Sequence, residues 1–211
     1  MNEKQTAISE FLQKGNMPEV IKLCKEAIED GMTASDILDS LLNGMGIIGG
    51  KFKNNEVFVP EVLIAARAMN GGLGVIRPLL VSEGVKSIGK VVIGTVKGDL
   101  HDIGKNLVSM MMVGSGFEVI DLGVDVSPEK YIAAVEEHHA DIVCMSALLT
   151  TTMTNMKAVI TALEEKGLRD QVKVMIGGAP VTDKFAAEIG ADKYTADAAS
   201  AAEEAKKLVL A

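Results

Sequence analysis

The second half of the chain alternates short apolar runs with helical segments, and this alternation constrains the fold more than any other feature. Four runs are almost wholly apolar and a fifth is weaker: Lys90–Thr95, Val119–Leu122, Asp141–Ser146, Val172–Gly177 and Asp192–Tyr194. A strand that is covered on both faces carries apolar side chains at nearly every position rather than at alternate positions. The runs therefore predict buried strands of a parallel sheet.

Segments with helical character follow the five runs, at about 103–115, 128–139, 152–166, 181–189 and 197–210. Strands that alternate with helices are typical of an α/β fold with helices on both faces of the sheet. Five such units predict a flavodoxin-like (Rossmann-type) doubly wound parallel five-stranded sheet with strand order 2-1-3-4-5.

The first half of the chain has a different pattern, in which apolar side chains recur at helical spacing. Four helices with short connections predict an N-terminal four-helix bundle. The segment 81–87 is the expected linker. We therefore expect a helical cap domain at 1–84 and an α/β domain at 85–211.

Charge and composition exclude several kinds of partner. The chain has 21 Lys and Arg against 29 Asp and Glu, a formal net charge of −8, with 3% aromatic residues and no Trp. Nucleic acids and anionic membranes both attract positive surfaces, so we expect neither as a partner. The N-terminus is polar, and no apolar run approaches the roughly 20 residues of a membrane span.

The two cysteines, Cys24 and Cys144, lie in a helical pattern and in a strand pattern, and no CxxC motif occurs. This excludes a zinc knuckle and indicates two buried, reduced thiols. The expected location is the cytoplasm.

The predicted fold indicates where a ligand binds. In a doubly wound sheet, ligands bind beyond the carboxyl ends of the strands, where the strand order reverses. The polar, glycine-rich segments 96–105, 146–152 and 177–180 follow the first, third and fourth strands. We expect them to form one cleft.

His101 is the candidate metal ligand in this cleft, two residues after Asp99. A carboxylate can hold one imidazole nitrogen while the other binds a metal. A single histidine does not hold a bare zinc ion, but it can be an axial ligand to a metal in a macrocycle. From spacing alone, His101 is either such a ligand or an ordinary loop histidine.

The run 94–106 contains Asp-x-His-x-x-Gly and resembles the corrinoid-binding signature of cobalamin-dependent methyltransferase systems. Ser146-Ala147-Leu148 matches the family's Ser-x-Leu element, and Gly177-Gly178 matches its Gly-Gly element. All three elements fall at expected strand ends. The first half is similar to the helical cap of the same proteins, so the resemblance covers essentially the whole chain.

The resemblance implies a role for each matching residue. His101 would be the lower axial ligand of cobalt in base-off/His-on cobalamin, and Asp99 would hold its other nitrogen. Thr152 stands where the family has a serine that completes this relay. The remaining implied cofactor contacts in the α/β domain are Gly98, Asp102, Ile103, Gly104, Ser146, Leu148, Thr150, Gly177, Gly178 and Ala198.

Two apolar residues of the helical half, Phe52 and Val59, correspond to the lid over the methyl group in the family, and Leu63, one turn after Val59, is a further candidate for this lid. Apolar residues at helical spacing more often form the core of a bundle. Both interpretations of these residues remain open at this point.

The resemblance implies a corrinoid methyl carrier. It would accept a methyl group on Co(I) cobalamin from a donor, through a substrate-specific methyltransferase with a TIM barrel. It would then deliver the group from methylcobalamin to a second methyltransferase, for a thiol or tetrahydrofolate acceptor. The chain has no room for a barrel of about 250 residues or for a reductive activase, so these partners would be other chains.

Three alternatives remain open. The cobalamin subunit of an adenosylcobalamin-dependent mutase shares the three elements, but the helical cap favours methyl transfer. A cobalamin-dependent sensor would normally carry an output module such as a basic DNA-binding helix, which the charge of −8 does not favour. A flavodoxin-like domain without cobalamin would leave the joint motif unexplained.

Overall fold

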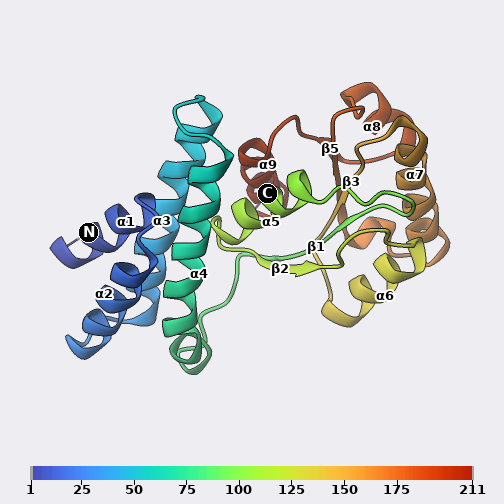
Figure 1. The fold of residues 1–211 in the computed structure, drawn as a ribbon. Coiled ribbons are helices and arrows are strands. Elements are labelled where there is room, and N and C mark those ends of the chain that lie inside the picture. Colours follow the sequence, from blue (N-terminus) through green and yellow to red (C-terminus); the bar gives the residue numbers. More distant parts are fainter. Residues whose placement is uncertain (1, 211) are drawn as a thin grey trace. The chain divides into compact units, whose positions relative to one another are not determined.

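The computed structural model describes residues 2–210. The chain divides into two compact units between Ser87 and Ile88, and each unit is described separately (Figure 1).

The first unit consists of four helices, α1 Glu3–Gln13, α2 Met17–Glu29, α3 Ala34–Lys53 and α4 Val59–Ser82. The residues before the first three helices, Asn2, Asn16 and Thr33, each accept a hydrogen bond from a backbone N–H of the first turn, which satisfies a donor that the helix itself leaves free. The apolar stripes of the helices face one another around a core that includes Leu12, Leu41 and Ile76.

The length of the apolar segment in α4 differs from the sequence expectation. Among the described helices, α4 alone is long and apolar enough to cross a membrane, with a mean hydropathy of 1.2 in its most apolar window. The expectation that no apolar run approaches this length is therefore wrong. Buried helices of soluble bundles pass the same test, and the buried residues Val62, Ala65 and Met69 of α4 lie in the bundle core.

The second unit is a sheet of five parallel strands with the order β2-β1-β3-β4-β5. This confirms the predicted fold class. The strands are β1 Lys90–Thr95, β2 Glu118–Asp121, β3 Ile142–Ser146, β4 Lys173–Gly177 and β5 Lys193–Tyr194. The α-helices are α5 Ile103–Val113, α6 Pro128–His138, α7 Thr150–Glu165, α8 Asp183–Ile189 and α9 Ala198–Leu210, and a short 3-10 helix spans Arg169–Gln171.

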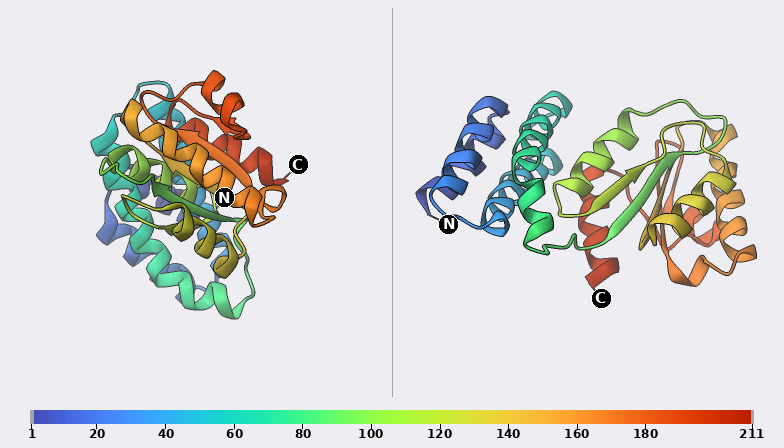
Figure 2. Two further views of the ribbon diagram at one scale, coloured as in Figure 1. Left: turned by 90° about the vertical axis from the view of Figure 1, so that its right-hand side faces the viewer. Right: turned by 90° about the horizontal axis from the view of Figure 1, so that it is seen from below.

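Helices cover both faces of this sheet, with α5 and α9 on one face and α6, α7 and α8 on the other (Figure 1, Figure 2). Because both faces are covered, the central strands are buried along nearly their whole length. Both cysteines are buried free thiols, as the sequence predicts.

The register of the sheet aligns the ends of its three central strands. Thr95, the last residue of β1, lies opposite Ser146 of β3, which lies opposite Gly177 of β4. The loops that follow these three strands therefore begin side by side at one edge of the sheet.

Candidate functional site

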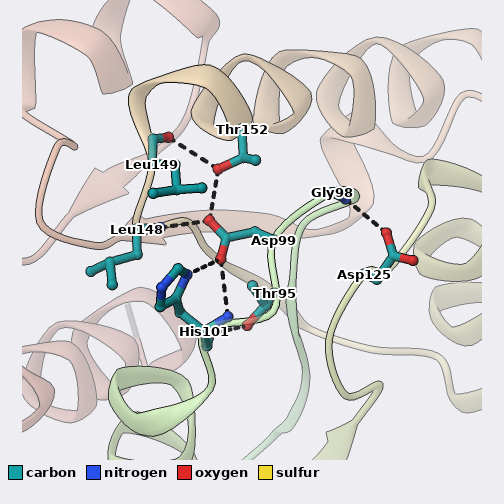
Figure 3. A network of polar contacts seen from close by, with 8 residues as sticks. All are labelled: Thr95, Gly98, Asp99, His101, Asp125, Leu148, Leu149 and Thr152. Carbon is teal, nitrogen blue, oxygen red and sulfur yellow. Dashed lines mark hydrogen bonds and ion pairs between the residues drawn. The ribbon is translucent and has the colours of Figure 1, made fainter.

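A buried carboxylate lies at the centre of this edge. Asp99 has no exposed surface, and its two oxygens accept hydrogen bonds from three parts of the chain (Figure 3). Oδ1 accepts from the backbone N–H of His101 at 3.0 Å and contacts the imidazole Nδ1 of His101 at 2.7 Å. Oδ2 accepts from the backbone N–H of Leu148 at 2.8 Å and from the hydroxyl of Thr152 at 2.6 Å.

These contacts determine the charge of Asp99. Burial by itself would raise the pKa of this carboxyl. The hydrogen bonds from Thr152, from the N–H groups of His101 and Leu148 and from the His101 ring outweigh burial and hold the pKa well below its usual value. Asp99 is therefore an anion at neutral pH.

The His101 side chain is half-exposed, whereas its Asp99 partner is covered. Because the anion at Asp99 accepts a hydrogen bond, Nδ1 is the protonated ring nitrogen in the neutral imidazole. The lone pair then lies on Nε2. The arrangement prepares His101 to bind one ligand, such as a metal ion, through Nε2.

Thr152 lies in the first turn of α7, where its hydroxyl reaches both Asp99 and the carbonyl of Leu149, at 2.6 and 3.0 Å. A hydroxyl has one proton, and the charged acceptor binds it more strongly than the neutral carbonyl. Threonine thus makes the hydroxyl contact that the family resemblance assigns to serine.

Exposed apolar side chains lie close to His101 in the sequence and in the loop that follows β3. Leu100 and Ile103 have 71% and 75% of their surface exposed, and Leu148 and Leu149 are also exposed. Such residues normally mark a binding surface when they occur together. Leu100 and Leu149 are not among the residues predicted from the sequence, although their apolar side chains next to a polar loop motif were the available signal.

The candidate glycines differ in how much space surrounds them, as the contacts of an added Cβ atom show. A Cβ at Gly104 would have nothing within 4 Å, so the space beside the first turn of α5 is open. A Cβ at Gly178 would lie 1.9 Å from the carbonyl oxygen of Ala147, at a φ of +129°. Gly178 is therefore required by the close approach of two loops, independently of any ligand.

The other predicted residues of this unit are distributed around the same edge. Asp102 precedes α5 and accepts a hydrogen bond from Asn106 at 3.0 Å. Ser146 ends β3, Thr150 begins α7, and Ala198 is buried at the start of α9. Gly98 adopts a φ of +81° in the loop before Asp99.

Phe52, Val59 and Leu63 belong to the helical unit. Phe52 and Val59 are partly buried and Leu63 is exposed, so none of the three is fully buried in the bundle core.

Three further polar residues hold the loop after β1, and none of them was predicted from the sequence as a site residue. The Thr95 hydroxyl donates to the carbonyl of His101 at 2.9 Å. Asp125 accepts from the N–H of Gly98 at 2.7 Å, and the Asn155 amide donates to the carbonyl of Lys97 at 2.7 Å. Asp125 and Asn155 are distant from the loop in sequence, and no local pattern connects them to it.

Within residues 2–210, no group of three or more His, Cys, Asp and Glu side chains could hold a metal ion. His101 could therefore supply one ligand to a metal that is held mainly by another group, and the exposed apolar side chains near it and the open space beside Gly104 would suit a group with apolar surface.

Comparison with known proteins connects both units to one kind of cofactor. Residues 89–206 and residues 5–77 each match a family model described as a B12 binding domain. A corrinoid protein of Desulfitobacterium hafniense is 42% identical over 194 residues, covering 90% of both chains. The dimethylamine corrinoid protein of Methanosarcina barkeri is 44% identical over 186 residues, covering 87% of this chain and 83% of its own.

A solved structure extends the comparison to the fold. The methanol:cobalamin methyltransferase complex MtaBC of Methanosarcina barkeri contains a chain that matches with a TM-score of 0.90 and 31% identity. The match covers 99% of this chain and 80% of that one.

Proposed function

The chain belongs to the family of B12-binding corrinoid proteins, and from this premise we propose that it carries a methyl group between two methyltransferases on a bound corrinoid. The observation that carries the proposal is the half-exposed imidazole of His101, held through Nδ1 by the buried anion Asp99. When bound, the corrinoid supplies a cobalt atom that can accept a methyl group and release it.

The residues at the edge of the sheet fit a corrinoid. Nε2 of His101 would bind the metal in place of the base at the end of the cofactor's own nucleotide tail (base-off/His-on). Leu100 and Ile103 offer apolar surface beside the histidine, and Gly104 leaves open space there. Ser146, Leu148, Thr150, Gly177 and Ala198 are the proposed contacts of the nucleotide tail.

Asp99 controls the ligand strength of His101 in this proposal. A carboxylate that accepts the Nδ1 proton makes Nε2 a stronger donor and fixes the orientation of the ring. The hydroxyl of Thr152 and the N–H of Leu148 keep Asp99 ionised.

The partners and the location complete the proposal. A donor-specific methyltransferase of the TIM-barrel type would load the carrier, and a second methyltransferase would pass the group to a thiol or to tetrahydrofolate. A reductive activase would restore the reactive cobalt state. The proposed setting is the cytoplasm, where thiols such as Cys144 stay reduced.

Absorption spectroscopy tests the ligand assignment. The purified apoprotein is reconstituted with hydroxocobalamin and with methylcobalamin, and His101→Ala is compared with the control His138→Ala, which changes a histidine at the end of α6. We expect His101→Ala alone to lose the His-on features and to weaken retention of the cofactor. An unchanged His101→Ala spectrum would exclude His101 as the lower ligand.

The carrier role needs a separate test. The reduced cobalamin protein is mixed with a methyltransferase that co-purifies with it and with candidate donors: methylamines, methanol, betaines and aryl methyl ethers. Appearance of the methylated spectrum with one donor supports the proposal. Turnover of an adenosylcobalamin-dependent rearrangement, with no methylation from any donor, would favour the mutase alternative.

A further inference from the structure

Thr95 lies directly beneath the histidine loop with its side chain completely buried. Its hydroxyl donates a hydrogen bond of 2.9 Å to the backbone carbonyl of His101, six residues later (Figure 3). The polar side chain of a buried strand residue is thus directed at the main chain of the candidate ligand, rather than at another part of the core.

The main chain of Thr95 is itself fixed on both sides. Its N–H donates to the carbonyl of Gly123 at 3.0 Å, and its carbonyl accepts from the N–H of Val126 at 3.0 Å. Thr95 also lies opposite Ser146 in the register of β1 and β3. The hydroxyl therefore extends from a main chain that is hydrogen-bonded on both sides.

His101 is consequently held at three points. Its N–H donates to Asp99 Oδ1, its ring Nδ1 contacts the same oxygen, and its carbonyl accepts from Thr95. Asp99 accepts at two of these points. Thr95 holds the third, the carbonyl of the peptide group that leads from His101 into Asp102 and α5.

We propose that Thr95 is a positioning residue for His101, and that its hydroxyl determines where the imidazole presents Nε2 to the cofactor. This inference rests on the proposed function, in which Nε2 binds the metal. Thr95 does not contact the cofactor in this account, and it acts only through the main chain of His101.

Thr95→Val is the informative substitution. Valine has nearly the shape of threonine and suits a strand, but it cannot donate, so the His101 carbonyl loses its partner. A hydrogen bond of this kind changes an equilibrium by about tenfold. Thr95→Ser keeps the hydroxyl and is the matched control, and Thr95→Ala is a second variant without a hydroxyl.

The experiment is a double-mutant cycle on cofactor binding. The dissociation constant for methylcobalamin and the His-on fraction of its spectrum are measured for the wild type, Thr95→Val, Thr95→Ala, Thr95→Ser, His101→Ala and the double variant Thr95→Val with His101→Ala. We expect Thr95→Val to weaken binding about tenfold and to lower the His-on fraction. Thr95→Ser should match the wild type, and Thr95→Val should have no further effect once His101 is absent.

The outcomes separate this inference from the proposed function. Equal weakening by Thr95→Val with and without His101 would show a general effect on the fold and overturn the inference, as would an unchanged His-on fraction in both Thr95→Val and Thr95→Ala. If His101→Ala itself keeps the wild-type spectrum, the ligand assignment fails instead. Unfolding of each apoprotein by urea identifies any variant that does not fold.

Discussion

Gly104→Ala should have opposite effects on the apoprotein and on the cofactor complex. Gly104 is the second residue of α5, and its surroundings within 4 Å are empty. In the apoprotein the new methyl group meets nothing and replaces the most flexible residue type in a helix by the best helix former. The free energy of unfolding should rise by about 0.5–1 kcal/mol.

The cofactor complex should respond in the other direction. If the open space beside Gly104 holds part of the corrinoid, the methyl group overpacks it. Overpacking of this kind costs typically about 1–3 kcal/mol, which corresponds to a loss of affinity of roughly fivefold to more than a hundredfold. The test is therefore whether Gly104→Ala stabilises the apoprotein and at the same time weakens cofactor binding.

Tyrosine fluorescence selectively reports the unfolding of the α/β unit. The chain has no Trp, and its two tyrosines, Tyr131 and Tyr194, both lie in the α/β unit. Urea unfolding followed by this signal reports on the unit that contains Gly104. The control is Gly74→Ala in α4, another exposed helical glycine with nothing within 4 Å, which should leave the tyrosine transition and the affinity for cobalamin unchanged.

Two results would refute the reasoning. Full cobalamin affinity in Gly104→Ala would mean that the space beside Gly104 is not part of the cofactor site. A less stable apoprotein would mean that α5 does not begin with the open geometry on which the stability gain depends.

Three further predictions concern the rest of the edge. Gly178→Ala should destabilise the apoprotein by about 2–5 kcal/mol, because its Cβ would overlap the Ala147 carbonyl at a left-handed φ. Gly177→Ala should cost less than about 1 kcal/mol, because its Cβ would lie 3.4 Å from its nearest neighbour. Urea unfolding measures the stability of both variants. The Asp99 carboxyl has a pKa below its ordinary 3.8, so its stabilisation is present above that pH and is lost as the pH falls further. Urea unfolding between about pH 2 and 5 should show a smaller loss of stability on acidification in Asp99→Asn than in the wild type, and an equal loss would contradict the role of this anion. Burial raises the pKa of Cys144 to about 12, so a thiol reagent at pH 8 should modify it only after unfolding; fast labelling of the native protein would contradict this.

The sequence determined the architecture because its signals are local. Wholly apolar runs predict strands buried on both faces, and helical spacing between them predicts a parallel sheet. The parallel order then brings the ends of β1, β3 and β4 to one edge, so the loop with Asp99 and His101 was predictable as part of a cleft. Asp99 and His101 are two residues apart, so the pair can be recognised from the sequence without tertiary information.

The tertiary structure decided which groups hold that pair, apart from Thr152, which the family resemblance had already assigned to this relay. Thr152 and Leu148 reach Asp99 from about 50 residues away in the chain, at separations of 53 and 49, and Asn155 holds Lys97 across a separation of 58. Whether Gly178 faces a ligand or the Ala147 carbonyl also depends on how closely two loops approach. Periodicity and propensity describe neighbours along the chain, whereas hydrogen-bond direction and ångström-scale clearance arise only when distant segments pack together.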